Sequence, residues 1–228
     1  MKTVIKLGGH LFPCKPTPEK ISAYAETLKK LRELGHRLIV VTGGGRVART
    51  YIDAARRLGA SEFTCDLLGI EVSRLNARLF IANMSEDAYP EPVTSLSMLL
   101  RAFETNKIVF LGGLQPGQST NAVGVLSAEA VNADLFINAT DVDGVYTADP
   151  EVDPTAKKLE IVRTDELLKM LLAKKLLAGS YALFDPVAIK LVERSKIPTR
   201  IIDGRNPANI EAAAKGKDVG TLIVSAAQ

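Results

Sequence analysis

The chain is poor in the residues that hold metals and disulfides. Its 228 residues include only two cysteines (Cys14 and Cys65), two histidines (His10 and His36) and no tryptophan. The spacing of the cysteines and histidines fits neither a zinc site nor a disulfide framework. We therefore interpret all four as structural residues and assign no metal ligand among them.

Long hydrophobic runs and a strong charge bias are also missing. No apolar run approaches the ~20 residues of a membrane span, and Met1–Thr3 leads into a strand rather than a signal peptide. The net charge is only +3, and basic residues are interspersed with acidic ones, so no nucleic-acid surface is indicated. We expect a cytoplasmic protein that binds neither membranes nor nucleic acids, while anionic small molecules remain natural ligands.

Short apolar runs that end in glycines occur three times. They are Thr3–Leu7 before Gly8-Gly9, Leu38–Val41 before Thr42 and Gly43–Gly45, and Lys107–Leu111 before Gly112-Gly113. Each predicts a buried strand and a loop whose backbone lacks Cβ atoms, so that a ligand can approach closely. The free amides of a following helix suit a phosphate. An ordinary tight turn is the alternative for any single loop, and the repetition favours phosphate binding.

A fourth predicted strand, 133–139, leads into an aspartate-rich loop. Residues 140–150 read TDVDGVYTADP and contain three aspartates. A calcium loop is excluded, because the required glycine, later acidic ligands and flanking helices do not follow at the right offsets. Since carboxyl ends of parallel strands share one edge of a sheet, all four loops should converge there.

Helical and strand patterns alternate along the chain. Helices are predicted at about 19–34, 47–58, 66–87, 94–104, 122–132, 165–177, 186–195 and 207–214, with further strands near 158–162, 199–202 and 221–224. The alternation predicts an α/β fold in which helices cover both faces of a mostly parallel central sheet, a three-layer sandwich. We expect one domain with two lobes, about 1–135 and 136–228. The apolar face of the helix 66–87 fits either the core or a subunit interface.

Lys6 is the first candidate for chemistry. A lysine in a strand often extends to the sheet edge without a function, but here its ammonium could reach a phosphate held by Gly8-Gly9.

The loop 114–121, LQPGQSTN, offers small polar groups to a phosphate or a ring edge, with a plain surface loop as the alternative. Neither the Walker pattern nor G-x-G-x-x-G occurs, which favours phosphoryl transfer on another scaffold.

The ordered motifs resemble the amino-acid kinase superfamily over essentially the whole chain. The resemblance lies in Lys6–Gly9, Val41–Gly45 and Thr140–Tyr146 through Asp149-Pro150. Within that superfamily, Asp66–Ile70, Ser73–Ala77 and Gly112–Thr120 are similar to the archaeal type of uridylate (UMP) kinase.

This resemblance implies an activity. The family transfers the γ-phosphoryl group of ATP to UMP, giving UDP for pyrimidine nucleotide biosynthesis, and requires Mg²⁺ with ATP. Members are typically homo-oligomers, hexamers built as trimers of dimers, and UTP commonly inhibits them. The first lobe then takes the phosphate acceptor and the second takes ATP.

The resemblance also assigns residues, with Asp66 on the ribose hydroxyls of UMP. The catalytic set is Lys6, Asp143 and Lys190. The ATP-binding set is Gly8, Gly9, His10, Gly45, Arg49, Thr140, Asp141, Tyr146 and Asp149. The UMP-binding set is Gly43, Gly44, Asp66, Gly113, Leu114, Gln115, Pro116, Gly117, Gln118, Ser119 and Thr120.

Three positions depart from the pattern. His10 stands where many superfamily members have serine, and its backbone amide can still serve. Asn121 replaces an aspartate that often orients the catalytic lysines, which leaves that role open between Asn121 and Asp143. Asp141 stands where asparagine is frequent, and its charge could alter base or metal preference.

Two alternatives stay open at this point. One is a kinase of the same fold for another acceptor, namely isopentenyl phosphate, carbamate or acetylglutamate. Isopentenyl phosphate kinases rely on a histidine soon after the glycine loop, and no histidine follows Gly45 in this sequence. The other is a non-catalytic nucleotide-sensing domain, against which the retention of Lys6 and of two glycine loops argues.

Overall fold

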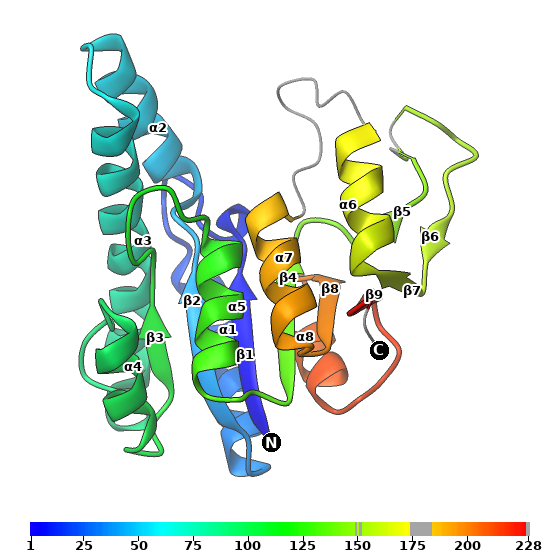
Figure 1. Cartoon of the computed structure of the whole chain (residues 1–228). Helices are drawn as coiled ribbons and strands as arrows, with labels where there is room; N and C mark the ends of the chain where they lie inside the picture. Colours follow the sequence, from blue (N-terminus) through cyan, green and yellow to red (C-terminus); the bar gives the residue numbers. More distant parts are fainter. Residues whose placement is uncertain (149, 151, 174–183, 227–228) are drawn as a thin grey trace.

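The structure is a computed structural model that describes residues 1–148, 150, 152–173 and 184–226 (Figure 1). The strands of the main sheet are β1 (Lys2–Leu7), β2 (Arg37–Thr42), β3 (Val109–Leu111), β4 (Leu135–Thr140), β7 (Ile161–Arg163), β8 (Thr199–Asp203) and β9 (Thr221–Val224). The helices are α1 (Pro18–Glu33), α2 (Gly45–Arg57), α3 (Glu62–Met84), α4 (Leu96–Phe103), α5 (Thr120–Ala130), α6 (Thr164–Ala173), α7 (Pro186–Ser195) and α8 (Pro207–Ala214), with short 3-10 turns η1 (Gly9–Leu11) and η2 (Ser85–Asp87).

One sheet runs through both halves of the chain. Within the described residues its order is β3-β2-β1-β4-β8-β9-β7. All neighbouring strands are parallel except β8 and β9, which are antiparallel. A separate two-stranded sheet pairs β5 (Val145–Tyr146) with β6 (Lys158–Leu159). The predicted mostly parallel sheet is confirmed.

Helices cover both faces of the sheet, as a strand buried on both sides requires. One apolar core joins α4, α5 and α7 to one face, and a second joins α1, α3 and α8 to the other. The outer layers are therefore helical on both sides, and the predicted three-layer sandwich is confirmed. In Figure 1, α2 and the start of α3 extend beyond the carboxyl edge of the sheet, at the upper left.

Local capping explains where several boundaries differ from the sequence pattern. The helix predicted from 66 starts at Glu62, because the Ser61 hydroxyl accepts a hydrogen bond from the amide of Thr64. The strand predicted over 158–162 is divided: β6 pairs with β5, and β7 joins the main sheet next to β9. The helix predicted over 165–177 is α6, which is described only to Ala173.

The described helices include none that is both long and apolar enough to cross a membrane.

Candidate active site

The carboxyl ends of five parallel strands meet at one edge of the sheet. These are the ends of β3, β2, β1, β4 and β8, in spatial order. The three glycine loops and the aspartate-rich loop therefore lie side by side, as the sequence predicts. The end of β8, at Asp203, adds a fifth segment that the sequence reasoning did not assign to the site.

The first two glycine loops pack directly against each other. A Cβ atom built on Gly43 would lie 2.9 Å from the amide nitrogen of Gly9, and one built on Gly45 would overlap the carbonyl oxygen of Phe12. Gly45 also has φ +68°, a conformation that L side chains rarely adopt. Part of the glycine pattern thus serves the close approach of two backbones rather than of a ligand.

Backbone hydrogen bonds show which loop amides remain for a ligand. Gly8 donates to Ala139, Gly43 donates to Leu7, and Arg46, in the first turn of α2, donates to the carbonyl of Phe12. In the part of the chain that the structure describes, the amides of four other loop residues donate to no backbone group: Gly9, His10, Gly44 and Gly45. Backbone amides without a backbone acceptor are the groups that bind anions in other proteins. Gly9, His10 and Gly45 belong to the predicted ATP-binding set, and Gly44 belongs to the predicted UMP-binding set.

Polar residues of α3 hold the glycine loops in place. The Asn76 side-chain amide donates to the carbonyl oxygens of Gly43 at 2.8 Å and Gly44 at 3.3 Å. The Ser73 hydroxyl accepts from the amide of Gly113 at 2.7 Å, and the Arg74 guanidinium donates to the carbonyls of Gly113 and Leu114. Because the carbonyls are held by α3, the loops are fixed without any ligand.

A cavity of about 170 Å³ lies between the second and third glycine loops and α3. It brings together most of the predicted UMP residues, and the wall residues include Gly44, Asp66, Gly113, Gln115, Gln118 and Thr120. The Asp66 carboxylate accepts a 2.8 Å hydrogen bond from the amide of Gly117, so the loop 114–119 is tied to α3 across the cavity. Of the remaining predicted contacts, Pro116 lies in this loop, while the Gly43 carbonyl faces Asn76.

Lys6 is buried near the carboxyl end of β1, where α5 packs against the strand. Burial is the main influence on its ammonium and lowers the pKa of Lys6 from 10.5 to about 8, while the carboxylates of Asp141 and Asp185 oppose the shift. At pH 7 the side chain is therefore still mostly protonated. A charged, desolvated ammonium at the phosphate edge can stabilise negative charge strongly.

Asp185 is a site residue that the sequence reasoning missed. It is the N-cap of α7, where one carboxylate oxygen accepts from the amide of Ala188 at 3.0 Å. Its other oxygen accepts a hydrogen bond from the hydroxyl of Ser119, the N-cap of α5. The sequence pattern identified the start of this helix at Pro186 but not that its cap acts on Lys6.

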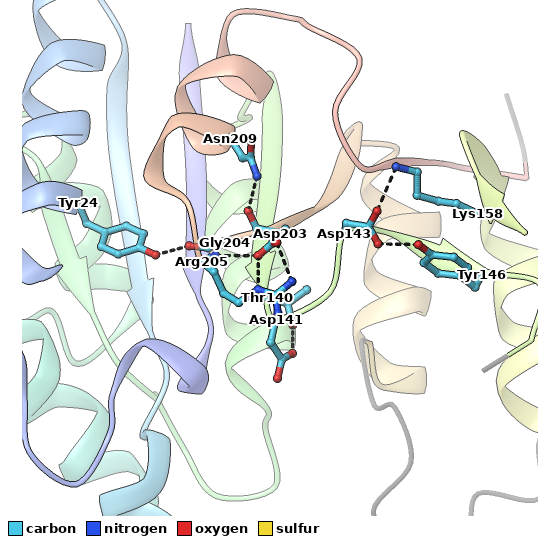
Figure 2. Close-up of polar contacts among 10 residues, drawn as sticks. All are labelled: Tyr24, Thr140, Asp141, Asp143, Tyr146, Lys158, Asp203, Gly204, Arg205 and Asn209. Atoms are coloured by element: carbon cyan, nitrogen blue, oxygen red, sulfur yellow. Dashed lines mark hydrogen bonds and ion pairs between the residues drawn. The ribbon is translucent and has the colours of Figure 1, made fainter. Parts of the chain in front are cut away.

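The aspartate-rich loop has two separate parts, which Figure 2 shows. In the first, Thr140 donates to the carboxylate of the exposed Asp141 at 3.0 Å. In the second, the Asp143 carboxylate accepts from the hydroxyl of Tyr146 at 2.8 Å and from Lys158 at 3.2 Å. Asp143 and Lys158 line another cavity, of about 470 Å³, behind the loop. Asp141 and Asp185 are the carboxylates that raise the pKa of Lys6, and the lysine-orienting role of Asp143 stays a prediction.

The end of β8 contributes a further charged pair next to the site. Arg205 donates to both carboxylate oxygens of Asp203, at 2.9 and 2.8 Å, and Tyr24 donates its hydroxyl to the carbonyl of Gly204 (Figure 2). His10 lies near this pair, and burial chiefly lowers the pKa of its imidazole to about 4. The His10 ring is therefore neutral near pH 7.

Two predicted residues are exposed on helices, and a third is not described. Lys190 is exposed on α7, where its ammonium donates to Glu193 on the same helix at 2.6 Å, so it is not gathered with Lys6. Arg49 is exposed on α2. Asp149 lies outside the described residues.

Comparisons with known proteins agree with this geometry. The model of the amino acid kinase family matches residues 1–203. A uridylate kinase of Hyperthermus butylicus is 48% identical over 221 residues, which cover 96% of this chain and 96% of that protein. A uridylate kinase of Methanococcoides burtonii is 44% identical over 92% of this chain and 89% of its own length.

A solved structure is similar along nearly the whole chain. The crystal structure of the uridylate kinase from Archaeoglobus fulgidus has a TM-score of 0.89 at 40% sequence identity, and the match covers 98% of this chain and 100% of that one. The glycine loops and most of the aspartate-rich loop's strand neighbours lie within residues 1–203, which the family model matches. The chain belongs to the amino acid kinase family.

Proposed function

We propose that the protein transfers the γ-phosphoryl group of ATP to UMP and releases UDP and ADP. The observation that carries this proposal is the cavity lined by Asp66, a glycine loop and the loop 113–120, at the sheet edge where β1, the strand of the buried Lys6, also ends. The relatives named uridylate kinase at 48% and 44% identity support the same acceptor. Such an enzyme supplies UDP to pyrimidine nucleotide synthesis.

The proposed mechanism depends on position and charge. The amides of Gly9, His10, Gly44 and Gly45 receive the phosphates of the two nucleotides, with the acceptor phosphate on Gly44 and the donor phosphates on the others. Holding two anions in line converts a bimolecular reaction into an effectively intramolecular one. The Lys6 ammonium then stabilises charge that develops on the transferring group.

Mg²⁺ is proposed to enter with ATP. In the described ranges no cluster of three or more histidine, cysteine, aspartate or glutamate side chains could hold a metal by itself, which fits a cation bound chiefly by the nucleotide phosphates. When bound, it neutralises phosphate charge. No protein residue needs to be assigned to it for the roles given above.

The donor nucleoside is proposed to lie along the aspartate-rich loop. Thr140, Asp141 and Tyr146 belong to this part of the site, with Asp149 from the sequence motif. The two halves of the chain, about 1–135 and 136–228, then take the acceptor and the donor respectively. UTP, as a uridine nucleotide, is proposed to inhibit by competing for the acceptor site, and the enzyme is proposed to act in the cytoplasm.

A homo-oligomer, with a hexamer of three dimers as the specific expectation, belongs to the same proposal. Large apolar side chains stand exposed along α2 and α3, among them Tyr51, Leu58, Phe63 and Leu75. Exposed large apolar side chains on neighbouring helices are the kind of surface that favours association with a second copy of the chain. Sedimentation at equilibrium measures the assembly state, and a monomer at micromolar concentration would contradict this part.

A coupled ADP-release assay tests the activity. ATP and Mg²⁺ are offered with UMP, dUMP, CMP, isopentenyl phosphate, carbamate and acetylglutamate in turn. Turnover with UMP well above every other acceptor is expected. Turnover of another acceptor with none of UMP would refute the proposal, and nucleotide binding without turnover of any acceptor would favour a sensing domain.

A further inference from the structure

The second glycine loop has no side chains of its own to hold its backbone. Gly43, Gly44 and Gly45 follow one another, and glycine has the greatest backbone freedom of all residues. Each peptide unit of such a loop can rotate, so that its amide points toward a bound anion or away from it. An orientation that suits a phosphate must therefore be imposed by groups outside the loop.

One side chain of α3 contacts two successive peptide units of this loop. The Asn76 side-chain amide donates to the carbonyl oxygen of Gly43 at 2.8 Å and to that of Gly44 at 3.3 Å. Asn76 is 6% exposed, so both hydrogen bonds form where little water competes. Two carbonyl oxygens in succession are thus directed at the same buried nitrogen atom.

The direction of a carbonyl sets the direction of the next amide. A peptide unit is planar and trans, so its C=O and N–H bonds point in opposite directions. The Gly43 carbonyl shares a unit with the amide of Gly44, and the Gly44 carbonyl shares one with the amide of Gly45. Both amides therefore point away from Asn76, and in the described part of the chain neither donates to a backbone group.

Asn76 lies on the packed side of the loop. It is one of the buried residues of α3, together with Ser73 and Ala77, whereas Gly44 lies in the wall of the cavity of about 170 Å³. Amides that point away from Asn76 are turned out of the contact with α3 and are open to a ligand. These are two of the amides to which the proposed mechanism assigns the phosphates.

We propose that Asn76 is a positioning residue for phosphate binding: by holding two carbonyls of the second glycine loop, it directs the amides of Gly44 and Gly45 at the phosphates of the two substrates. The proposal rests on the function proposed above, in which Gly44 receives the acceptor phosphate and Gly45 a donor phosphate. Asn76 itself touches neither substrate. Without it, a glycine peptide unit can turn over and present a carbonyl oxygen, which repels an anion.

The two peptide units differ in how much they depend on Asn76. The Gly44 carbonyl also accepts from the amide of Ala48 in α2, at 3.4 Å. Within the described residues the Gly43 carbonyl accepts from Asn76 alone. Loss of Asn76 should therefore disturb the Gly44 amide, which belongs to the unit of the Gly43 carbonyl, more than the Gly45 amide. The acceptor phosphate is then affected more than the donor phosphates.

Three substitutions of Asn76 test the donor role. Aspartate has the shape of asparagine, but its carboxylate only accepts hydrogen bonds, whereas glutamine keeps the donor on a longer side chain. The affinity for UMP, measured by calorimetry, should fall about tenfold in Asn76→Ala, at least as much in Asn76→Asp, and less in Asn76→Gln. A residue that merely fills space would make Asn76→Asp the variant nearest to wild type, and that order would overturn the proposal.

Ligands with and without phosphate separate the amides from the rest of the site. Uridine lacks the phosphate, so Asn76→Ala should bind it with wild-type affinity while UMP binding weakens. The affinity for ADP should fall less than that for UMP, because the Gly44 carbonyl keeps its hydrogen bond from Ala48. Equal losses for uridine and UMP in a folded variant would overturn the proposal. Thermal melting shows that each variant is folded, and Asn76→Gln, the mildest change, replaces Asn76→Ala should that variant fail to fold.

Asn83→Ala is the matched control. Asn83 lies about two turns further along the same helix, and its side-chain amide donates to the hydroxyl of Ser22 at 3.1 Å. This variant also removes an asparagine donor from α3, but one that does not contact a glycine loop. Its affinities for UMP, ADP and uridine should equal those of the wild type, and a loss of UMP affinity as large as in Asn76→Ala would overturn the proposal.

Inorganic tripolyphosphate separates this inference from the proposed function, because it presents phosphates without any nucleoside. It should bind the wild type and bind Asn76→Ala more weakly. Equal affinity for the two proteins, or binding to neither, would overturn the inference even if UMP is phosphorylated. Absence of UMP phosphorylation by the wild type would refute the proposed function instead, while tripolyphosphate binding still decides whether Asn76 directs the amides.

Discussion

The carboxylate of Asp66 accepts a 2.8 Å hydrogen bond from the backbone amide of Gly117, which ties the long helix α3 to the loop over the acceptor cavity. This contact involves one carboxylate oxygen and leaves the other for a ligand. Asp66 can thus fix the loop and hydrogen-bond to a ribose hydroxyl at the same time. The fold positions it, since Ser61 starts α3 one turn before Asp66.

We predict that UMP is preferred over dUMP through Asp66. Loss of the 2′-hydroxyl leaves a charged acceptor without its partner, which costs about 1–3 kcal/mol. The kcat/KM for dUMP should therefore be about 10- to 100-fold lower than for UMP, and Asp66→Asn should reduce this ratio. Steady-state kinetics with both acceptors measure it.

A control variant at another exposed aspartate shows whether the loss of a negative charge alone changes the preference for UMP over dUMP. Asp53 is exposed on the neighbouring helix α2 and pairs with Arg56, so Asp53→Asn should keep the wild-type preference. Equal kcat/KM values for UMP and dUMP in the wild type would remove Asp66 from ribose recognition.

Lys6→Met is predicted to lower kcat by about 10²–10³, or roughly 3–4 kcal/mol of transition-state stabilisation, with smaller changes in either KM. The reason is that the ammonium acts on charge that grows during transfer. Steady-state kinetics and thermal melting of the same variant test the prediction together.

Lys2→Met is the control on the same strand. The Lys2 ammonium donates to the carbonyl of Val131 at 2.8 Å, at the other end of β1, so its loss should affect stability rather than kcat. A folded Lys6→Met enzyme that keeps more than about a third of the wild-type kcat would exclude Lys6 from the mechanism.

Local sequence signals predicted the strands, the glycine loops and Lys6, because each depends on a few neighbouring residues. Helices α7 and α8 begin and end at the predicted residues, since Pro186 and Pro207 mark their first turns. The convergence of the loops at one sheet edge followed from parallel pairing alone.

Contacts between distant segments could not be predicted in the same way. Asp185 and Lys6 lie far apart in the sequence, and an aspartate before a proline reads simply as a helix cap. The paired side chains of Asp203 and Arg205 carry no motif, although an aspartate at the end of a predicted parallel strand could have suggested a site residue. Asn76 and Ser73 lie in a helix whose apolar spacing predicts its buried face. That spacing does not indicate which polar residues contact the glycine loops.

The depressed pKa of Lys6 predicts a specific pH dependence of stability. The folded-state pKa is about 8 and the ordinary pKa of a lysine is 10.5, so between these values the unfolded state binds more protons and stability rises with pH. Relative to Lys6→Met, the wild type should therefore gain free energy of unfolding from about pH 8 to pH 10.5, by roughly 3 kcal/mol. Urea unfolding at several pH values measures the difference, and a difference that is constant with pH would show that burial does not depress this pKa.

The glycine at the start of α2 is predicted to be irreplaceable for stability. Gly45 has φ +68°, and a Cβ there would overlap the carbonyl oxygen of Phe12. Gly45→Ala combines a left-handed conformation with this overlap and should lower the free energy of unfolding by about 2–4 kcal/mol.

Gly59 is the matched control, because it has φ +84° but nothing within 4 Å of a built Cβ. Gly59→Ala should lower the free energy of unfolding by only about 1 kcal/mol. Urea denaturation of the two variants gives both values, and equal losses would mean that the contact between the first two glycine loops contributes nothing beyond backbone conformation.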